Sequence, residues 1–210
     1  MGSIDNERLE LKALISAIKD NDIQINTFLE VGSRDGADAD FISKKLNLLP
    51  QNVFVVEAHP AFYKFIKKKY SQYKIFNYGA WKQEGELLFN AALNFDDGRS
   101  SLIERDIYKE NFKKVLIKTK TIDSMIKQNF KTTIDCCKID VEGASYEVLQ
   151  GFKENLKNLK ILQIETEQKK IWNNQHCYDK VYELLVSHDF KKVWEIKLGS
   201  TQLDSIWIKK

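Results

Sequence analysis

The stretch Thr27–Gly36, with the sequence TFLEVGSRDG, constrains the fold of this chain more than any other segment. It opens with an apolar, β-branched and aromatic run that is typical of a strand buried on both faces of a sheet. Gly32 and Gly36 follow on either side of Ser33, and glycine adopts backbone angles closed to other residues and lets a ligand approach the main chain. The carboxylate of Glu30 stands just before them. The pattern predicts a strand, then a ligand-binding turn, then a helix.

The spacing of the turn separates two classes of nucleotide ligand. A dinucleotide fingerprint requires glycine at the first, third and sixth positions of the turn. Gly32, Arg34 and Ala37 occupy these positions, so two of the three glycines are missing. The carboxylate of Glu30 would also repel a pyrophosphate. The turn therefore disfavours a dinucleotide and favours a ligand that carries positive charge.

Composition and charge restrict the class of protein further. The 210 residues are enough for one domain with a substantial core, and the formal net charge of +3 comes from lysines scattered among many acids. This charge pattern is only weak evidence for a nucleic-acid or membrane surface. The three cysteines show no metal-ligand spacing or disulfide framework, and no signal peptide or membrane span is evident. We expect a reduced, cytoplasmic protein without a bound nucleic acid.

Strand and helix patterns alternate along the remaining chain, which predicts an α/β fold with a mainly parallel sheet covered on both faces. Strands are expected at Asn52–Glu57, Lys74–Tyr78, Gly85–Ala91, Val115–Lys120, Ile134–Val141 and Ile161–Ile164, followed by a hairpin of Val193–Ile196 with Ser205–Ile208. Helical stripes of buried residues are expected at Leu11, Leu14, Ile15 and Ile18, at Ala39, Ile42, Leu46 and Leu49, and at Phe62, Phe65, Ile66 and Tyr70. We assign residues 1–210 to one domain, with a helical segment over 1–24 and a Rossmann-like core over 25–210.

Acidic residues recur at the ends of the predicted strands. They are Glu30, Glu57, Asp140 with Glu142, and Glu165 with Glu167. Ligands of such sheets bind beyond the carboxyl ends of the strands, so these acids mark a site there. Helix capping is the competing interpretation; it is preferred for Asp35 and Asp38 and stays open for Glu142.

Several ordered motifs carry a resemblance to a known family. After TFLEVGSRDG come VVEAHP, YGAW with GELLF, GRSSL, KTKTIDSM and KIDVEGASYEVLQGF. Over about Thr27–Glu165 the chain resembles the FkbM family of S-adenosylmethionine-dependent O-methyltransferases. The resemblance implies a class I methyltransferase fold, which is a Rossmann-like three-layer sandwich with a mainly parallel seven-stranded sheet and a C-terminal antiparallel hairpin. It also implies methylation of a hydroxyl on a small or saccharide-linked acceptor, such as a glycan, a sugar nucleotide or a polyketide-like molecule.

Two positions depart from the family pattern. Glu30 stands where the first motif usually has Asp, and Ser145 stands where an acid usually follows the glycine of KIDVEG. The serine keeps open a second hypothesis, a catalytically silent cofactor-binding partner subunit. Methylation of RNA or protein is a third, although no basic groove with interleaved aromatic residues is evident.

The resemblance assigns S-adenosylmethionine binding to specific positions. These are Glu30, Gly32, Ser33, Gly36, Glu57, Ala58, Gly79, Ala80 and Asp140. Glu57 is expected to accept hydrogen bonds from both ribose hydroxyls. The glycine turn is expected to cradle the methionine part with Glu30 attracting its cationic groups, and Gly79 and Ala80 are expected to wall the adenine.

Catalytic roles are assigned around the KIDVEG motif. Asp140 and Glu142 are candidates for the base or orienting group, and Lys138 could pair with Asp140 and keep it ionised. His176, beyond the fifth strand, is a further candidate base because its pKa lies near neutrality. A solvated loop histidine is the competing interpretation.

A divalent metal and an anion-binding arginine are two further possibilities left open by the sequence. Asp140, Glu142, Glu165 and Glu167 could converge on Mg²⁺, which prefers oxygen ligands. Arg99 could bind an acidic group of the acceptor or the carboxylate of the cofactor, and a solvated loop arginine is the alternative.

Overall fold

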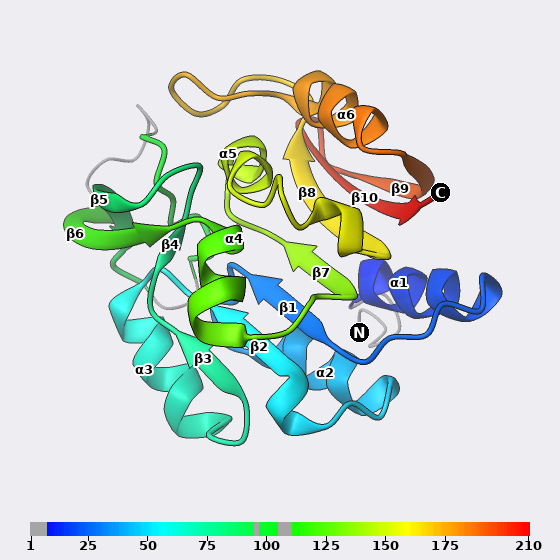
Figure 1. Cartoon of the computed structure of the whole chain (residues 1–210). Helices are drawn as coiled ribbons and strands as arrows, with labels where there is room; N and C mark the ends of the chain where they lie inside the picture. The colour runs from blue at the N-terminus through cyan, green and yellow to red at the C-terminus, as the bar shows by residue number, and fades with distance from the viewer. Residues whose placement is uncertain (1–7, 95–96, 105–110) are drawn as a thin grey trace, which may run out of the picture.

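The protein, as a computed structural model that describes residues 8–94, 97–104 and 111–210, is built on a seven-stranded sheet with helices on both sides (Figure 1). From one edge to the other the strands are β3 (Lys74–Phe76), β2 (Val53–Val56), β1 (Phe28–Val31), β7 (Cys136–Ile139), β8 (Ile161–Glu167), β10 (Gln202–Lys209) and β9 (Phe190–Leu198). Strands β3, β2, β1, β7 and β8 are parallel, and β10 runs antiparallel to both of its neighbours. The predicted parallel sheet with a C-terminal hairpin is confirmed.

Both faces of this sheet are covered because the inner strands are apolar on both sides. Leu29 and Val31 of β1 belong to one core cluster, and Phe28 belongs to a second cluster on the opposite face. The helices are α1 (Leu9–Asp20), α2 (Ala37–Lys45), α3 (Pro60–Lys69), α4 (Ile122–Met125), α5 (Ser145–Gln150) and α6 (Tyr178–Ser187). Short 3-10 turns lie at Pro50–Asn52 and Leu156–Asn158, and a π-helical segment at Ile126–Phe130 follows α4. Helices α1 and α2 contribute to the cluster of Phe28, and α4, α5 and α6 contribute to the other. The result is a three-layer α/β sandwich.

A second sheet stands beside the carboxyl end of the first. Its strand order is β4 (Gly79–Ala80), β6 (Phe112–Lys120) and β5 (Gly85–Ala92). Phe89, Ala91 and Ile117 form a small core on one face of it. The sequence predicts β5 and β6 but not their separation into a sheet of their own.

Two residues of the predicted helical stripes are exposed. Helix α2 ends at Lys45, so Leu49 lies beyond it with 59% of its surface exposed, and the expectation that it faces the core is wrong. Phe65 of α3 is 39% exposed, because Phe62 and Ile66 alone take the buried side of that helix. The ammonium of Lys69 lies 5.4 Å from the centre of the Phe65 ring, so the ring meets a charged side chain in place of the core.

Candidate active site

A cavity of about 430 Å³ opens where β1, β2 and β7 end. Of the residues predicted for the site, it is lined by Gly32, Ser33, Glu57, Ala58, Gly79, Ala80, Lys138, Asp140, Glu142 and Glu165. Phe62, Tyr78, Phe89 and Leu102 make one part of its wall apolar. Glu30, Gly36, Glu167 and His176 are not among the described residues of the wall.

The glycine turn passes directly against the end of β7. The N–H of Gly32 donates to the carbonyl of Val56 at 3.0 Å, and its φ is +79°. A β-carbon on Gly32 would lie 1.7 Å from the carbonyl oxygen of Asp140, so no other residue fits. The backbone of Asp140 therefore requires glycine at position 32. Because glycine has no side chain, the turn and Asp140 can lie in direct contact.

Gly36 has a different environment from Gly32. A β-carbon there would lie 2.7 Å from the ring of Tyr70 and 2.9 Å from Ile66. Gly36 directly precedes α2 and lets this helix pack closely against the end of α3. Its position does not support the predicted contact with a ligand.

Glu57 follows β2 and holds the turn through its side chain. Its carboxylate accepts backbone N–H groups from Ser33 at 3.0 Å, from Arg34 at 2.9 Å and from His59 at 2.6 Å. Burial raises the pKa of Glu57, and the three N–H donors oppose that rise. A carboxylate offers about four acceptor positions, so about one is left for a ligand. The geometry therefore allows one ribose hydroxyl rather than the two expected from the sequence.

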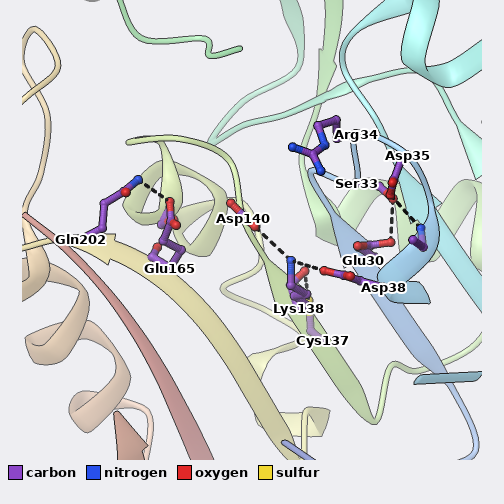
Figure 2. A network of polar contacts seen from close by, with 12 residues as sticks. Glu30, Ser33, Arg34, Asp35, Asp38, Cys137, Lys138, Asp140, Glu165 and Gln202 are labelled. Atoms are coloured by element: carbon purple, nitrogen blue, oxygen red, sulfur yellow. Dashed lines mark hydrogen bonds and ion pairs between the residues drawn. The ribbon is translucent and has the colours of Figure 1, made fainter. Parts of the chain in front are cut away.

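Glu30 lies beneath the turn and is only 1% exposed. The hydroxyl of Ser33 donates to it at 2.7 Å, and Figure 2 shows this bond beside Lys138. Burial, with the nearby carboxylate of Asp38, raises the pKa of Glu30 to about 8, against the opposing charge of Lys138. The side chain stabilises the turn from inside the protein, so the expected direct attraction of the cofactor by Glu30 is not supported by its position.

Lys138 connects two carboxylates at the floor of the cavity. Its ammonium lies 3.0 Å from Asp140 and 3.1 Å from Asp38, and Figure 2 draws both contacts as dashed lines. Burial works to lower the pKa of Lys138, but the charges of Asp140, Asp38 and Glu30 outweigh it and hold the pKa well above its usual value. Lys138 is therefore charged, and it forms an ion pair with both Asp140 and Asp38.

Three of the four acids considered for a metal come together. Carboxylate oxygens of Asp140, Glu142 and Glu165 all lie within 4.8 Å of one another. Burial, followed by the charges of Asp140 and Glu142, raises the pKa of Glu165 well above its usual value, and Gln202 donates to Glu165 at 3.1 Å. Glu167 is instead bonded to the amide of Gln175.

The remaining candidates lie outside the cavity wall. His176 is 2.8 Å from the carboxylate of Glu147 and packs on the ring of Tyr146. The guanidinium of Arg99 binds Asp97 at 2.8 and 2.7 Å. Neither residue lines the cavity.

Sequence reasoning missed several residues that the structure brings to the cavity. Arg8 and Glu10 reach it from the start of α1, and Arg34 and Asp38 reach it from the turn and α2. The position of Asp38 could have been predicted from the sequence, because an acid in the first helical turn, two residues after Gly36, faces the end of a parallel sheet. The positions of Arg8 and Glu10 could not have been predicted, since they depend on how α1 packs on the sheet.

Ser145, the departure from the family pattern, has a structural role. Its hydroxyl donates to the carbonyl of Glu165 at 2.7 Å and ties the start of α5 to β8. The residue is 3% exposed and does not line the cavity.

This strand order, with the cavity at the carboxyl ends of the parallel strands, is similar to the fold of solved S-adenosylmethionine-dependent methyltransferases. Magnesium protoporphyrin IX methyltransferase (ChlM) from Synechocystis PCC 6803 with bound S-adenosylmethionine has a TM-score of 0.55 at 8% identity, over 96% of this chain and 78% of its own. The putative tRNA (m1A22) methyltransferase Sp1610 of Streptococcus pneumoniae, in complex with S-adenosylmethionine, has a TM-score of 0.51 at 13% identity, over 95% of this chain and 72% of its own.

The sequence profile described as Methyltransferase FkbM domain matches residues 30–195, so the chain belongs to the FkbM methyltransferase family. The methyltransferase FkbM of Methylobacillus flagellatus KT has a TM-score of 0.53 at 13% identity, over 87% of this chain and 44% of its own. No curated protein matches the sequence. S-adenosylmethionine is the cofactor of this enzyme. None of the described helices is long and apolar enough to span a membrane.

Proposed function

We propose that this enzyme transfers the methyl group of S-adenosylmethionine to a hydroxyl of a small or saccharide-linked acceptor, such as a glycan, a sugar nucleotide or a polyketide-like molecule. One observation carries the proposal: Asp140, paired with the buried cation of Lys138, lies in the cavity against the glycine turn. An ionised carboxylate at this place can accept the proton of a hydroxyl as the oxygen is methylated.

The cavity fits the cofactor in two ways. The apolar wall beside Ala58, Gly79 and Ala80 suits an adenine ring, and Glu57 retains one acceptor position for a ribose hydroxyl. We assign the methionine part of the cofactor to the turn at Gly32 and Ser33. When bound, S-adenosylmethionine supplies an electrophilic methyl group on a sulfonium.

The residues of the chain then orient the acceptor and take its proton. Much of the rate of such a displacement comes from holding the acceptor oxygen in line with the leaving sulfur. Asp140 accepts the proton of the hydroxyl, Lys138 orients Asp140 through their ion pair, and Glu142 hydrogen-bonds the acceptor. Glu165 lines the same part of the cavity, and burial raises the pKa of its carboxyl group well above the usual value.

Methyl transfer to a panel of sugar nucleotides, glycans and polyketide-like alcohols tests the proposal. We expect turnover by the wild type, a loss of about 100-fold or more in Asp140→Asn, and no change in the exposed control Asp179→Asn. RNA and protein substrates belong in the same panel. Methylation of RNA or protein alone would contradict the proposal, and binding of S-adenosylhomocysteine without any turnover would favour the silent partner subunit.

The three converging carboxylates also fit Mg²⁺, since the ion prefers carboxylate oxygens. Held by Asp140, Glu142 and Glu165, it would lower the pKa of the acceptor hydroxyl. This part of the proposal predicts that exhaustive chelation abolishes turnover and that added Mg²⁺ restores it. Full activity after chelation would remove the metal and leave Asp140 as the base.

We also propose that residues 1–210 act as one domain in the cytoplasm. Cys136, Cys137 and Cys177 all carry free thiols, which is the usual state in a reducing compartment. Fractionation of cells that produce the protein tests the location.

A further inference from the structure

Glu142 has a backbone conformation that a residue with a β-carbon rarely adopts. Its φ is +51°, in the left-handed region, and the residue lines the cavity between Asp140 and Ala144. Such a conformation persists only where the surrounding structure enforces it, and it is frequent at functional sites. Other segments of the protein must therefore hold Glu142 in this conformation.

Ser101 supplies one part of that restraint. Its hydroxyl donates to the carbonyl oxygen of Glu142 at 2.6 Å, and the residue is 1% exposed. Its own backbone is fixed to β5, because the N–H and the carbonyl of Ser101 bond the carbonyl and the N–H of Asn90. A donor that is bridged to β5 of the second sheet thus fixes the peptide that follows Glu142.

Trp172, in the loop between β8 and α6, supplies the other part. Gly143 has a φ of +88°, and a β-carbon on it would lie 2.4 Å from Cδ1 of the Trp172 ring. The indole is 3% exposed and packs with Ile103 and Ala144. The face of the ring thus fills the space that only glycine leaves, and it restrains the residue after Glu142.

The two restraints also reinforce each other. Ile103, two residues after Ser101, contacts Trp172, and the N–H of Asn173 donates to the carbonyl of Glu104 at 2.8 Å. The loops that carry Ser101 and Trp172 are therefore joined over the loop that carries Glu142. These contacts come from segments about 40 and 30 residues away from Glu142 in the sequence.

We propose that Ser101 and Trp172 are positioning residues that hold the carboxylate of Glu142 toward the acceptor, acting on methyl transfer and not on cofactor binding. The inference rests on the proposed function, which gives Glu142 its contact with the acceptor. Neither side chain needs to touch the reacting atoms to have this effect.

Hydrogen exchange of Ser101→Ala and Trp172→Ala tests the structural half of this inference without any acceptor. We expect faster exchange in the peptide over residues 139–146 and unchanged exchange over residues 27–36, where the glycine turn lies. The matched controls are Ser187→Ala, on the surface of α6, and Trp194→Ala, in the edge strand β9. Unchanged exchange over 139–146 in both variants would overturn the inference.

Steady-state kinetics with the acceptor found by the panel tests the functional half. We expect a fall in kcat of about 10- to 100-fold in Ser101→Ala and Trp172→Ala, with an unchanged KM for S-adenosylmethionine. Trp172→Phe keeps a ring against Gly143 and should restore most of kcat. A raised KM for the cofactor with unchanged kcat would overturn the inference.

A double-substitution cycle separates the contact from a general loss of stability. Gly143→Ala should lower kcat strongly in the wild type, because its methyl collides with Trp172, and less in Trp172→Ala, where the ring is gone. Equal effects in both backgrounds would overturn the role of this contact. If the panel yields no acceptor while exchange over 139–146 does change, the proposed function fails and the restraint on Glu142 stands.

Discussion

Glu30 and Glu57 stand near the ends of neighbouring strands, yet their surroundings give them different tasks. Glu30 faces inward, where Ser33 and Lys138 are its neighbours, and Glu57 faces the cavity with three backbone donors. Both carboxylates hold the same turn from opposite sides. Both are glutamates at strand ends, which predicts a shared role in ligand binding, but only Glu57 lines the cavity.

The raised pKa of Glu30 predicts a specific dependence of stability on pH. Between its ordinary pKa of 4.5 and the folded value of about 8, the folded state holds a proton that the unfolded chain has released. Stability must then fall as the pH rises through this interval. Glu30→Gln lacks this titration. We therefore expect the unfolding free energy of Glu30→Gln minus that of the wild type, both measured in urea, to increase by roughly 1 kcal/mol or more from pH 5 to pH 8.

The exposed substitution Glu154→Gln serves as the control for that measurement and should track the wild type. Glutamine keeps an oxygen that accepts the hydroxyl of Ser33, so the bond to the turn is preserved. Parallel pH profiles for the wild type and Glu30→Gln would contradict a buried carboxyl with a raised pKa.

Glu57→Ala should weaken binding of S-adenosylhomocysteine by at least about 10-fold, because the substitution removes an acceptor and releases two N–H groups of the turn. Isothermal titration calorimetry measures this effect directly. Glu86→Ala, on the exposed side of β5, is the matched control. An unchanged affinity would remove Glu57 from the cofactor site.

Lys138 is the buried cation that balances Glu30, Asp38 and Asp140. Lys138→Met should lower the unfolding free energy by about 1–3 kcal/mol, since it leaves the partly exposed carboxylates of Asp38 and Asp140 without their cation. Adding Asp38→Asn to this variant should recover part of the loss, because one fewer charge then lacks a partner. Chemical denaturation with the exposed control Lys157→Met checks both effects, and a loss below about 1 kcal/mol would contradict this balance.

Among the elements, the contact between α5 and β4 sets the wall expected to face the adenine. Gly151 ends α5, and a β-carbon on it would lie 2.2 Å from the carbonyl oxygen of Trp81, the residue after β4. The N–H of Trp81 donates to the carbonyl of Lys120 in β6 at 2.9 Å. Close packing of α5 therefore fixes where the short strand β4 enters the cavity wall.

Gly151→Ala should cost about 1–3 kcal/mol of stability, because a backbone atom must move to admit the methyl group. It should also weaken binding of S-adenosylhomocysteine, since Gly79 and Ala80 move with Trp81. Gly199→Ala is the control: no atom lies within 4 Å of its added carbon, so binding should be unchanged. Wild-type affinity in Gly151→Ala would show that β4 is not held by this contact.

The elements around the parallel sheet could be predicted because their signals are local. Buried strands such as β1 and β2 show in the sequence as short apolar runs, and Pro60 marks the start of α3. Helix ends were less certain, as Leu49 shows, because apolar spacing continues beyond the last helical turn. The separate sheet of β4, β6 and β5 was missed, since pairing between distant strands leaves no local pattern.

For the molecule as a whole, the sequence located the site but not the direction of each side chain. The acids at strand ends do gather at one edge of the sheet, because parallel strands end together. Whether an acid faces the cavity or the interior depends on strand register and on helix packing. In the register of β1 and β7, Glu30 lies opposite Lys138, and both side chains are on the same face of the sheet. The sequence does not show this register, which places the side chain of Glu30 in the interior.

Contacts between distant loops are the least predictable part of the site. His176 looked like a possible base, but Glu147 and Tyr146 hold it outside the cavity. Trp172 gave no signal, although it packs on the glycine of the most specific motif. Both outcomes depend on the path of the chain between β8 and α6, which is set by packing over the whole molecule.

The central claim is that the cavity at the glycine turn binds a positively charged methyl donor and not a phosphate-bearing dinucleotide. Titration calorimetry of the wild type with S-adenosylmethionine and, separately, with NADH tests it most directly. The arrangement of Gly32, Glu57 and Asp140 predicts one binding site for S-adenosylmethionine and no measurable heat with NADH. Binding of NADH with no response to S-adenosylmethionine would contradict it.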